Sequence, residues 1–126
     1  PWAVESIPGL FTRNERLVLE FTAPQTSCAL VMVGAFLVGG LETIVTGPVR
    51  RGRREPACWN LEAAPRHFDR GEEIGRFNFG STVILLFPQG TVNLSDALGA
   101  GAELRLGEMI GTRDPGLGSR HPDFSV

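Results

Sequence analysis

The chain has 126 residues, of which 42% are hydrophobic, and a formal net charge of −2. This length and composition suit one globular unit with a core and exclude a disordered or collagen-like chain, and the charge gives no general attraction to nucleic acid. All twelve basic residues are arginine. Pyridoxal phosphate enzymes and lipoyl or biotinyl carriers need a lysine for covalent attachment, so these classes are excluded.

Short strand-like segments dominate the chain. They are rich in β-branched or large apolar residues, are bounded by glycine or proline, and cover residues 17–21, 29–33, 36–38, 41–45, 82–87 and 103–106. Residues 94–98 are long enough for at most one short helix. With 16 glycines and nine prolines, the pattern predicts an all-β fold, a small sandwich or barrel-like domain of short strands.

The two cysteines, Cys28 and Cys58, lie far apart and lack the paired spacing of metal sites, so we expect reduced thiols, an intracellular setting and no metal. The longest apolar run, residues 28–41, is shorter than the roughly 18 residues of a spanning helix and is broken by glycines. The sequence starts at Pro1 without a signal peptide. We therefore expect a piece of a longer protein with no transmembrane segment.

A basic loop contains Arg50, Arg51, Arg53 and Arg54 between two prolines. It can rest on anionic lipid, where each arginine contributes about 1 kcal/mol near the charged surface. It can equally be a solvated loop in a chain that uses no lysine.

A Gly-Glu-x-Ile-Gly motif occurs at residues 71–75 and again 36 positions later, at residues 107–111. Each copy follows a turn and carries one central apolar residue, which indicates an internal two-fold repeat. The alternative is a chance recurrence of two glycine turns. The tail, residues 112–126, is polar and rich in glycine, proline and charge, and is predicted to be flexible.

Gly80 and Ser81 form the pair that points most directly to chemistry. A serine hydroxyl after a glycine can reach the carbonyl carbon of its own preceding peptide bond, because glycine has no Cβ and tolerates strained dihedrals. Attack converts the amide to an ester, and loss of the Ser81 α-proton then expels the Gly80 carboxylate. The dehydroalanine that remains hydrolyses to a pyruvoyl group. The alternative is an ordinary turn that leads into a strand.

Further motifs stand in a fixed order between residues 2 and 111. They are Ile7-Pro8-Gly9-Leu10-Phe11-Thr12-Arg13-Asn14-Glu15-Arg16, Val33-Gly34-Ala35, Val38-Gly39-Gly40, Gly71-Glu72-Glu73-Ile74-Gly75-Arg76-Phe77 and Phe79-Gly80-Ser81-Thr82-Val83. Together they resemble the phosphatidylserine decarboxylase family. Arg13, Asn14, Glu15 and Arg16 carry part of this resemblance, but a charged turn before a strand explains them equally well.

The resemblance implies a proenzyme that cuts itself between Gly80 and Ser81. Residues 1–80 then belong to a β chain and residues 81–126 to an α chain, the two form a heterodimer, and Ser81 becomes the covalent pyruvoyl cofactor. In that family the ketone forms a Schiff base with phosphatidylserine and accepts electrons as carbon dioxide leaves. The product, phosphatidylethanolamine, belongs to phospholipid biosynthesis.

The resemblance also makes residues 1–111 the C-terminal part of a decarboxylase domain. The family's catalytic aspartate and histidine lie upstream of this segment, so we expect the chain alone neither to mature nor to turn over substrate efficiently. The implied location is peripheral, on the cytoplasmic face of the bacterial inner membrane and against its anionic surface. No nucleic acid partner is implied.

His67 and His121 are the two imidazoles, and neither corresponds to the family's histidine, so solvated surface roles are expected for both. Thr82 can orient the ester or simply open a strand. Phe77, Phe79 and Phe87 can shape an apolar slot for a lipid or pack in the core.

Two other classes of function compete with the decarboxylase. A non-catalytic β-sandwich module explains the repeat as architecture and Gly80-Ser81 as a turn. A serine hydrolase is disfavoured because the Gly-x-Ser-x-Gly motif is absent from the sequence.

Overall fold

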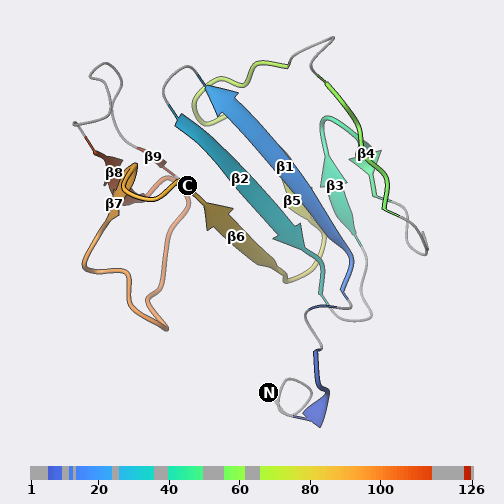
Figure 1. Cartoon of the computed structure of the whole chain (residues 1–126). Coiled ribbons are helices and arrows are strands. Elements are labelled where there is room, and N and C mark those ends of the chain that lie inside the picture. Colours follow the sequence, from blue (N-terminus) through green and yellow to red (C-terminus); the bar gives the residue numbers. More distant parts are fainter. Residues whose placement is uncertain are drawn as a thin grey trace. The chain divides into compact units, whose positions relative to one another are not determined.

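The computed structural model describes residues 6–9, 12, 14–23, 26–35, 40–49, 56–61, 66–114 and 124–125. The elements with defined bounds in this part of the chain are strands, arranged in three small sheets (Figure 1). The predicted mostly-β fold class is therefore confirmed. The chain divides into two compact units, Pro1–Leu17 with Met32–Ile84 and Val18–Val31 with Leu85–Val126.

One sheet has the order β1-β2-β6, formed by β1 (Arg16–Ala23), β2 (Thr26–Val33) and β6 (Thr82–Leu86). In Figure 1, β2 runs opposite to both of its neighbours. Burial alternates at the start of β1, where Leu17 is buried and Val18 is about half exposed, as expected for a strand with one covered face. The predictions of strands at residues 17–21, 29–33 and 82–87 are confirmed.

The first unit contains the sheet β4-β3-β5, formed by β4 (Gly47–Pro48), β3 (Leu41–Thr43) and β5 (Gly75–Phe77). Leu41 and Thr43 face the buried side of β3. The predicted strand at residues 41–45 ends early because the Thr43 hydroxyl accepts a hydrogen bond from the Thr46 backbone N–H at 3.0 Å, which turns the chain back into β4.

The second unit contains the sheet β7-β8-β9, formed by β7 (Val92–Leu94), β8 (Met109–Arg113) and β9 (Phe124–Ser125). Ile110 on β8 is buried. In place of the short helix allowed at residues 94–98, a turn follows β7, in which Leu98 N–H donates to the Ser95 carbonyl at 3.0 Å.

Three further predictions concern this unit and the segment before β3. The predicted strand at residues 103–106 is wrong, because these residues form a loop that ends in a turn at Leu106-Gly107. The predicted strand at residues 36–38 lies outside the described residues. The predicted boundary of the tail at 111/112 falls inside β8, β9 lies within that tail, and residues 115–123 and 126 are outside the described part.

Across the described residues, no helix combines the length and the apolar character needed to span a membrane.

The two Gly-Glu-x-Ile-Gly copies fold alike, as the repeat predicted. In the first copy, Glu72 N–H donates to the Asp69 carbonyl at 3.1 Å, and the Glu72 carboxylate accepts from Asp69 N–H at 2.9 Å. In the second copy, Glu108 and Arg105 make the same two bonds at 2.9 Å each. The glycine between them is left-handed in both copies, as a tight turn requires.

The equivalence extends to the neighbouring strand of each copy. Gly75 pairs with Thr43 in the first unit, and Gly111 pairs with Leu94 in the second. Beyond these pairs, Ile44 N–H donates to the Ile74 carbonyl at 3.1 Å, and Ser95 N–H donates to the Ile110 carbonyl at 2.9 Å. Each residue of the first copy therefore has a structural counterpart 36 positions later, and the two can be compared side chain by side chain.

Candidate functional site

Ser81 lies in the connection between β5 and β6, one residue before β6 begins at Thr82. The connection is tied to the first unit by Asn78, whose backbone N–H donates to the Gly40 carbonyl at 2.8 Å. The bend at Asn78 and Phe79 then carries the chain to Gly80 and Ser81. Ser81 therefore lies three residues after the hydrogen-bonded Asn78 and directly before the first residue of β6.

The Ser81 hydroxyl is exposed and donates to the backbone carbonyl of Phe79 at 2.9 Å. The carbonyl carbon that self-cleavage requires belongs to Gly80, the residue between them. Gly80 does not adopt a left-handed conformation, and a Cβ built on it meets no atom within 4 Å. The structure thus shows an exposed hydroxyl next to the Gly80 carbonyl, and this hydroxyl donates its proton to the Phe79 carbonyl.

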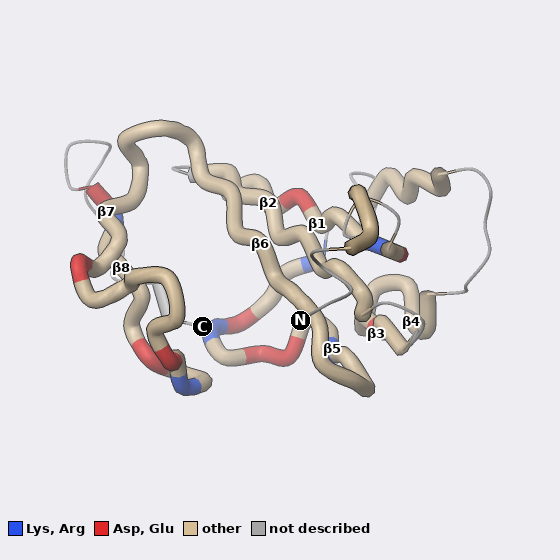
Figure 2. The backbone as a smooth tube through the Cα atoms, turned by 90° about the horizontal axis from the view of Figure 1, so that it is seen from below, with Lys and Arg blue, Asp and Glu red and all other residues tan. Residues whose placement is uncertain are grey.

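Strand β6 leaves Ser81 with all five of its residues exposed, among them Val83, Ile84, Leu85 and Leu86. No charged residue interrupts it, as Figure 2 shows along the β6 backbone. Strand β6 is also at the edge of its sheet, since β2 is its one neighbour in the described order β1-β2-β6. An exposed, uncharged edge strand of this kind is a candidate surface for contact with other groups.

The three phenylalanines near the site differ in burial. Phe79 is 63% exposed, whereas Phe77 and Phe87 are half-buried. Core packing therefore does not account for Phe79, which adds to the apolar surface beside Ser81. Thr82 occupies the first position of β6, where a β-branched residue suits the extended backbone.

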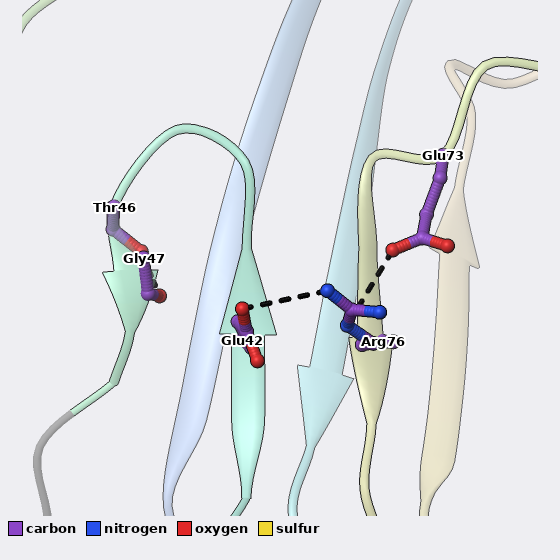
Figure 3. Close-up of polar contacts among 5 residues, drawn as sticks. All are labelled: Glu42, Thr46, Gly47, Glu73 and Arg76. Atoms are coloured by element: carbon purple, nitrogen blue, oxygen red, sulfur yellow. Dashed lines mark hydrogen bonds and ion pairs between the residues drawn. The ribbon is translucent and has the colours of Figure 1, made fainter.

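Arg76 on β5 pairs with two carboxylates, as Figure 3 shows. Its guanidinium lies 3.6 Å from Glu42, directly opposite on β3, and 3.6 Å from Glu73. All three side chains are substantially exposed, so each pair contributes at most about 1 kcal/mol. The pair with Glu42 links β3 to β5, the strand that leads to Ser81, whereas the pair with Glu73 joins residues of one segment.

The contact between Gly40 and Asn78 yields a prediction. Gly40 has φ +112°, and a Cβ built on it lies 3.0 Å from Asn78 Cβ and 3.2 Å from Asn78 Nδ2. Gly40→Ala should therefore lower the free energy of unfolding in urea by about 2–3 kcal/mol. Gly47→Ala is the control, because Gly47 has φ +65° and open space around it, and it should cost about 1 kcal/mol. Equal losses would contradict the role of the Asn78 contact.

The histidines and the arginines of the basic loop are the remaining candidate groups. His67 is exposed in the segment before the first turn, whereas His121 and the arginines of the basic loop lie outside the described residues. Within the described ranges, no cluster of three or more histidine, cysteine, aspartate or glutamate side chains is arranged to hold a metal ion.

Glu15 belongs to a motif of the family resemblance, but the sequence did not predict a chemical role for it. Its Oε2 atom is buried and has no hydrogen-bond partner among the described residues, while its backbone carbonyl accepts from Gly34 N–H at 2.8 Å. A buried carboxylate oxygen without a partner is costly. The signal for it in the sequence was its place in the charged run beside Asn14 and Arg16.

Cys28 and Cys58 are both free thiols, and they differ in environment. Burial raises the pKa of the Cys28 thiol above its ordinary value, whereas Cys58 is exposed. The thiolate is the reactive form, so iodoacetamide at pH 8 should modify Cys58 faster, and the Cys28 rate should rise only at higher pH. Peptide mass mapping over a pH series measures both sites, and an equal pH dependence would contradict the prediction.

Comparison with known proteins adds the family context. Residues 1–112 match the family model for phosphatidylserine decarboxylase. A phosphatidylserine decarboxylase proenzyme of Albidiferax ferrireducens is 40% identical over 116 residues, covering 91% of this chain and 41% of the relative. One of Methylibium petroleiphilum is 43% identical over 113 residues, covering 87% and 39%. One of Pseudomonas entomophila is 41% identical over 109 residues, covering 84% and 38%.

The chain thus spans about two fifths of the length of these curated relatives. No solved structure matches it. The matched residues include the site from Gly40 to Ser81 and both copies of the repeat.

Proposed function

The chain belongs to the phosphatidylserine decarboxylase family, and we propose that it is the part of a self-cleaving decarboxylase that carries the cleavage serine. The observation that carries the proposal is Ser81, an exposed hydroxyl directly after Gly80 inside the matched region. The relatives' name, proenzyme, is consistent with a chain that requires processing.

In this proposal, Ser81 Oγ attacks the carbonyl carbon of Gly80 and gives its proton to a base. The peptide C–N bond breaks, so that the Gly80 acyl group becomes an ester on Oγ. Loss of the α-proton then breaks the Cβ–Oγ bond and releases the Gly80 carboxylate, and water converts the remaining dehydroalanine to a pyruvoyl group with loss of ammonia. We place the base outside residues 1–126, because the resemblance puts the aspartate and histidine upstream.

Position 81 suits a pyruvoyl group because it is exposed and precedes an apolar strand. That group supplies a ketone that condenses with the amino group of phosphatidylserine and draws the electrons left as carbon dioxide departs, giving phosphatidylethanolamine. Phe79 and β6 provide apolar surface next to it for the lipid part of the substrate. We also place the protein peripherally on the cytoplasmic face of the bacterial inner membrane, against its anionic lipid, as the family resemblance implies.

The proposed heterodimer has a physical basis in the sheet β1-β2-β6. Cleavage after Gly80 places β1 and β2 in the β chain and β6 in the α chain. The ladder between β2 and β6 then joins the two products without a covalent link. This pairing supports the proposal that both chains stay together after maturation.

Intact mass and amino-terminal analysis of the protein expressed from its own gene test the proposed function. The expected result is a blocked chain that starts at position 81 and is converted to an alanine terminus by reductive amination. A single uncut chain would support the non-catalytic module instead. The isolated 126-residue chain should stay uncut at 13.6 kDa, and its spontaneous cleavage would contradict a base outside it.

A further inference from the structure

The two copies of the repeat share a backbone but differ in their exposed side chains. Glu73 of the first copy corresponds to Met109 of the second, 36 positions later. Glu73 is 58% exposed and pairs with Arg76, whereas Met109 is 55% exposed and apolar. The same position on the same backbone is thus charged in one copy and apolar in the other.

The turn of each copy shows the same contrast. Arg70 in the first copy corresponds to Leu106 in the second, and Leu106 is 95% exposed. The turn is held by the two hydrogen bonds between Arg105 and Glu108, so the leucine is presented outward by a fixed backbone. Leu104, two residues earlier, is also more than half exposed.

The neighbouring strand extends this apolar surface. Leu94 on β7 pairs with Gly111 and is more than half exposed. Met109 lies two residues before Gly111 on β8, next to a shift in the register between β8 and β9, and its side chain is also more than half exposed. We call Leu94, Leu104, Leu106 and Met109 the aliphatic turn.

The charges around the aliphatic turn are arranged asymmetrically. The carboxylate of Glu108 accepts a hydrogen bond from the Arg105 backbone at 2.9 Å. Arg105 stands between the two exposed leucines, and its guanidinium has no ion pair among the described residues. Glu103, one residue before Leu104, is a second exposed glutamate in this segment. A cation flanked by leucines is complementary to a phospholipid surface, where the phosphate lies just above the hydrocarbon.

We propose that the aliphatic turn is the surface by which the chain enters the interfacial region of a phospholipid bilayer. The inference rests on the proposed function, because a substrate embedded in a bilayer requires the enzyme to meet that bilayer. The turn projects exposed aliphatic side chains on both sides of the Arg105 cation, a combination found in segments that lie in the interfacial region of a bilayer. Attraction here comes mainly from apolar burial, so binding should persist at high salt.

Vesicle sedimentation of the full-length protein tests the proposal, with vesicles of phosphatidylcholine and phosphatidylglycerol at 7:3 in low and high salt. The double variant Leu104→Gln/Leu106→Gln should lower the partition coefficient by roughly tenfold or more at both salt concentrations. Leu106→Phe should retain binding, because phenylalanine suits the interfacial region of a bilayer. Retained binding would also show that substitution at this exposed position leaves the fold intact. Leu61→Gln, at an exposed leucine of the first unit, is the matched control and should bind as the unsubstituted protein does.

Unchanged binding by the double variant would overturn the proposal, as would binding that disappears at high salt, since that result would assign membrane contact to basic residues. Cleavage at Gly80/Ser81 is measured in parallel on each variant. A double variant that is cleaved but does not sediment supports the aliphatic turn. If the unsubstituted protein is not cleaved at Gly80/Ser81, the proposed function is refuted. This result does not depend on whether the protein binds vesicles.

Discussion

Ser81→Ala should leave the full-length protein as one uncut chain, with no detectable product that starts at position 81. The variant removes the nucleophile. In the connection between β5 and β6, residues 78–81, Ser81 is the one residue with a hydroxyl. Structure should be retained, because Ser81 is exposed and its hydroxyl makes a hydrogen bond to the Phe79 carbonyl two residues away. Intact mass spectrometry over several days gives the uncut fraction.

Ser81→Cys is the informative companion variant. A thiol can attack the same carbonyl carbon and can be eliminated in the same way, so this variant should still be cut, at a different rate, and should yield the same blocked terminus. Thr82→Ser is the neighbouring control and should be cut normally if Thr82 serves only to open β6. Cleavage that continues in Ser81→Ala would show that the cut lies elsewhere in the chain.

The sequence predicted the parts of the fold whose signal is local. Strands β1, β2 and β6 are runs of apolar and β-branched residues, which favour extended structure wherever they lie. Strand β5 was not predicted, because Gly75, Arg76 and Phe77 have no strand pattern of their own and become extended by pairing with β3. Alternating Leu104-Arg105-Leu106 suggested a strand, but the Glu108 side chain and the left-handed Gly107 impose a turn.

The candidate site divides in the same way. Gly80 and Ser81 could be named from the sequence, because the chemistry depends on neighbouring residues. The anchor at Asn78 and Gly40 could not, because it joins residues 38 positions apart and depends on how β3 and β5 pair. The repeat was visible as a motif, but its use as a comparison needed the hydrogen bonds that make each position in one copy equivalent to one in the other.

Gly75→Ala should produce the largest loss of stability in the first unit. A Cβ built on Gly75 lies 2.7 Å from the Glu42 backbone carbonyl, 3.1 Å from Thr43 Cγ2 and 3.2 Å from Met32 Cε. The carbonyl belongs to β3, the strand paired with Gly75, so it cannot withdraw without breaking the sheet. We expect the free energy of unfolding to fall by about 2–4 kcal/mol, a large part of the 5–15 kcal/mol typical of a domain.

The repeat makes the same prediction for the equivalent glycine of the second unit. A Cβ on Gly111 lies 2.7 Å from the Asn93 backbone carbonyl, so Gly111→Ala should cost about as much as Gly75→Ala. Gly99→Ala is the control, because a Cβ there meets nothing within 4 Å and the residue is not left-handed, and its effect should stay within about 0.5 kcal/mol. Urea denaturation of the three variants measures these losses. A Gly75 or Gly111 variant as stable as Gly99→Ala would mean that the strands pair less closely than the structure shows. Two similar large losses are expected because the two copies of the repeat have the same backbone arrangement.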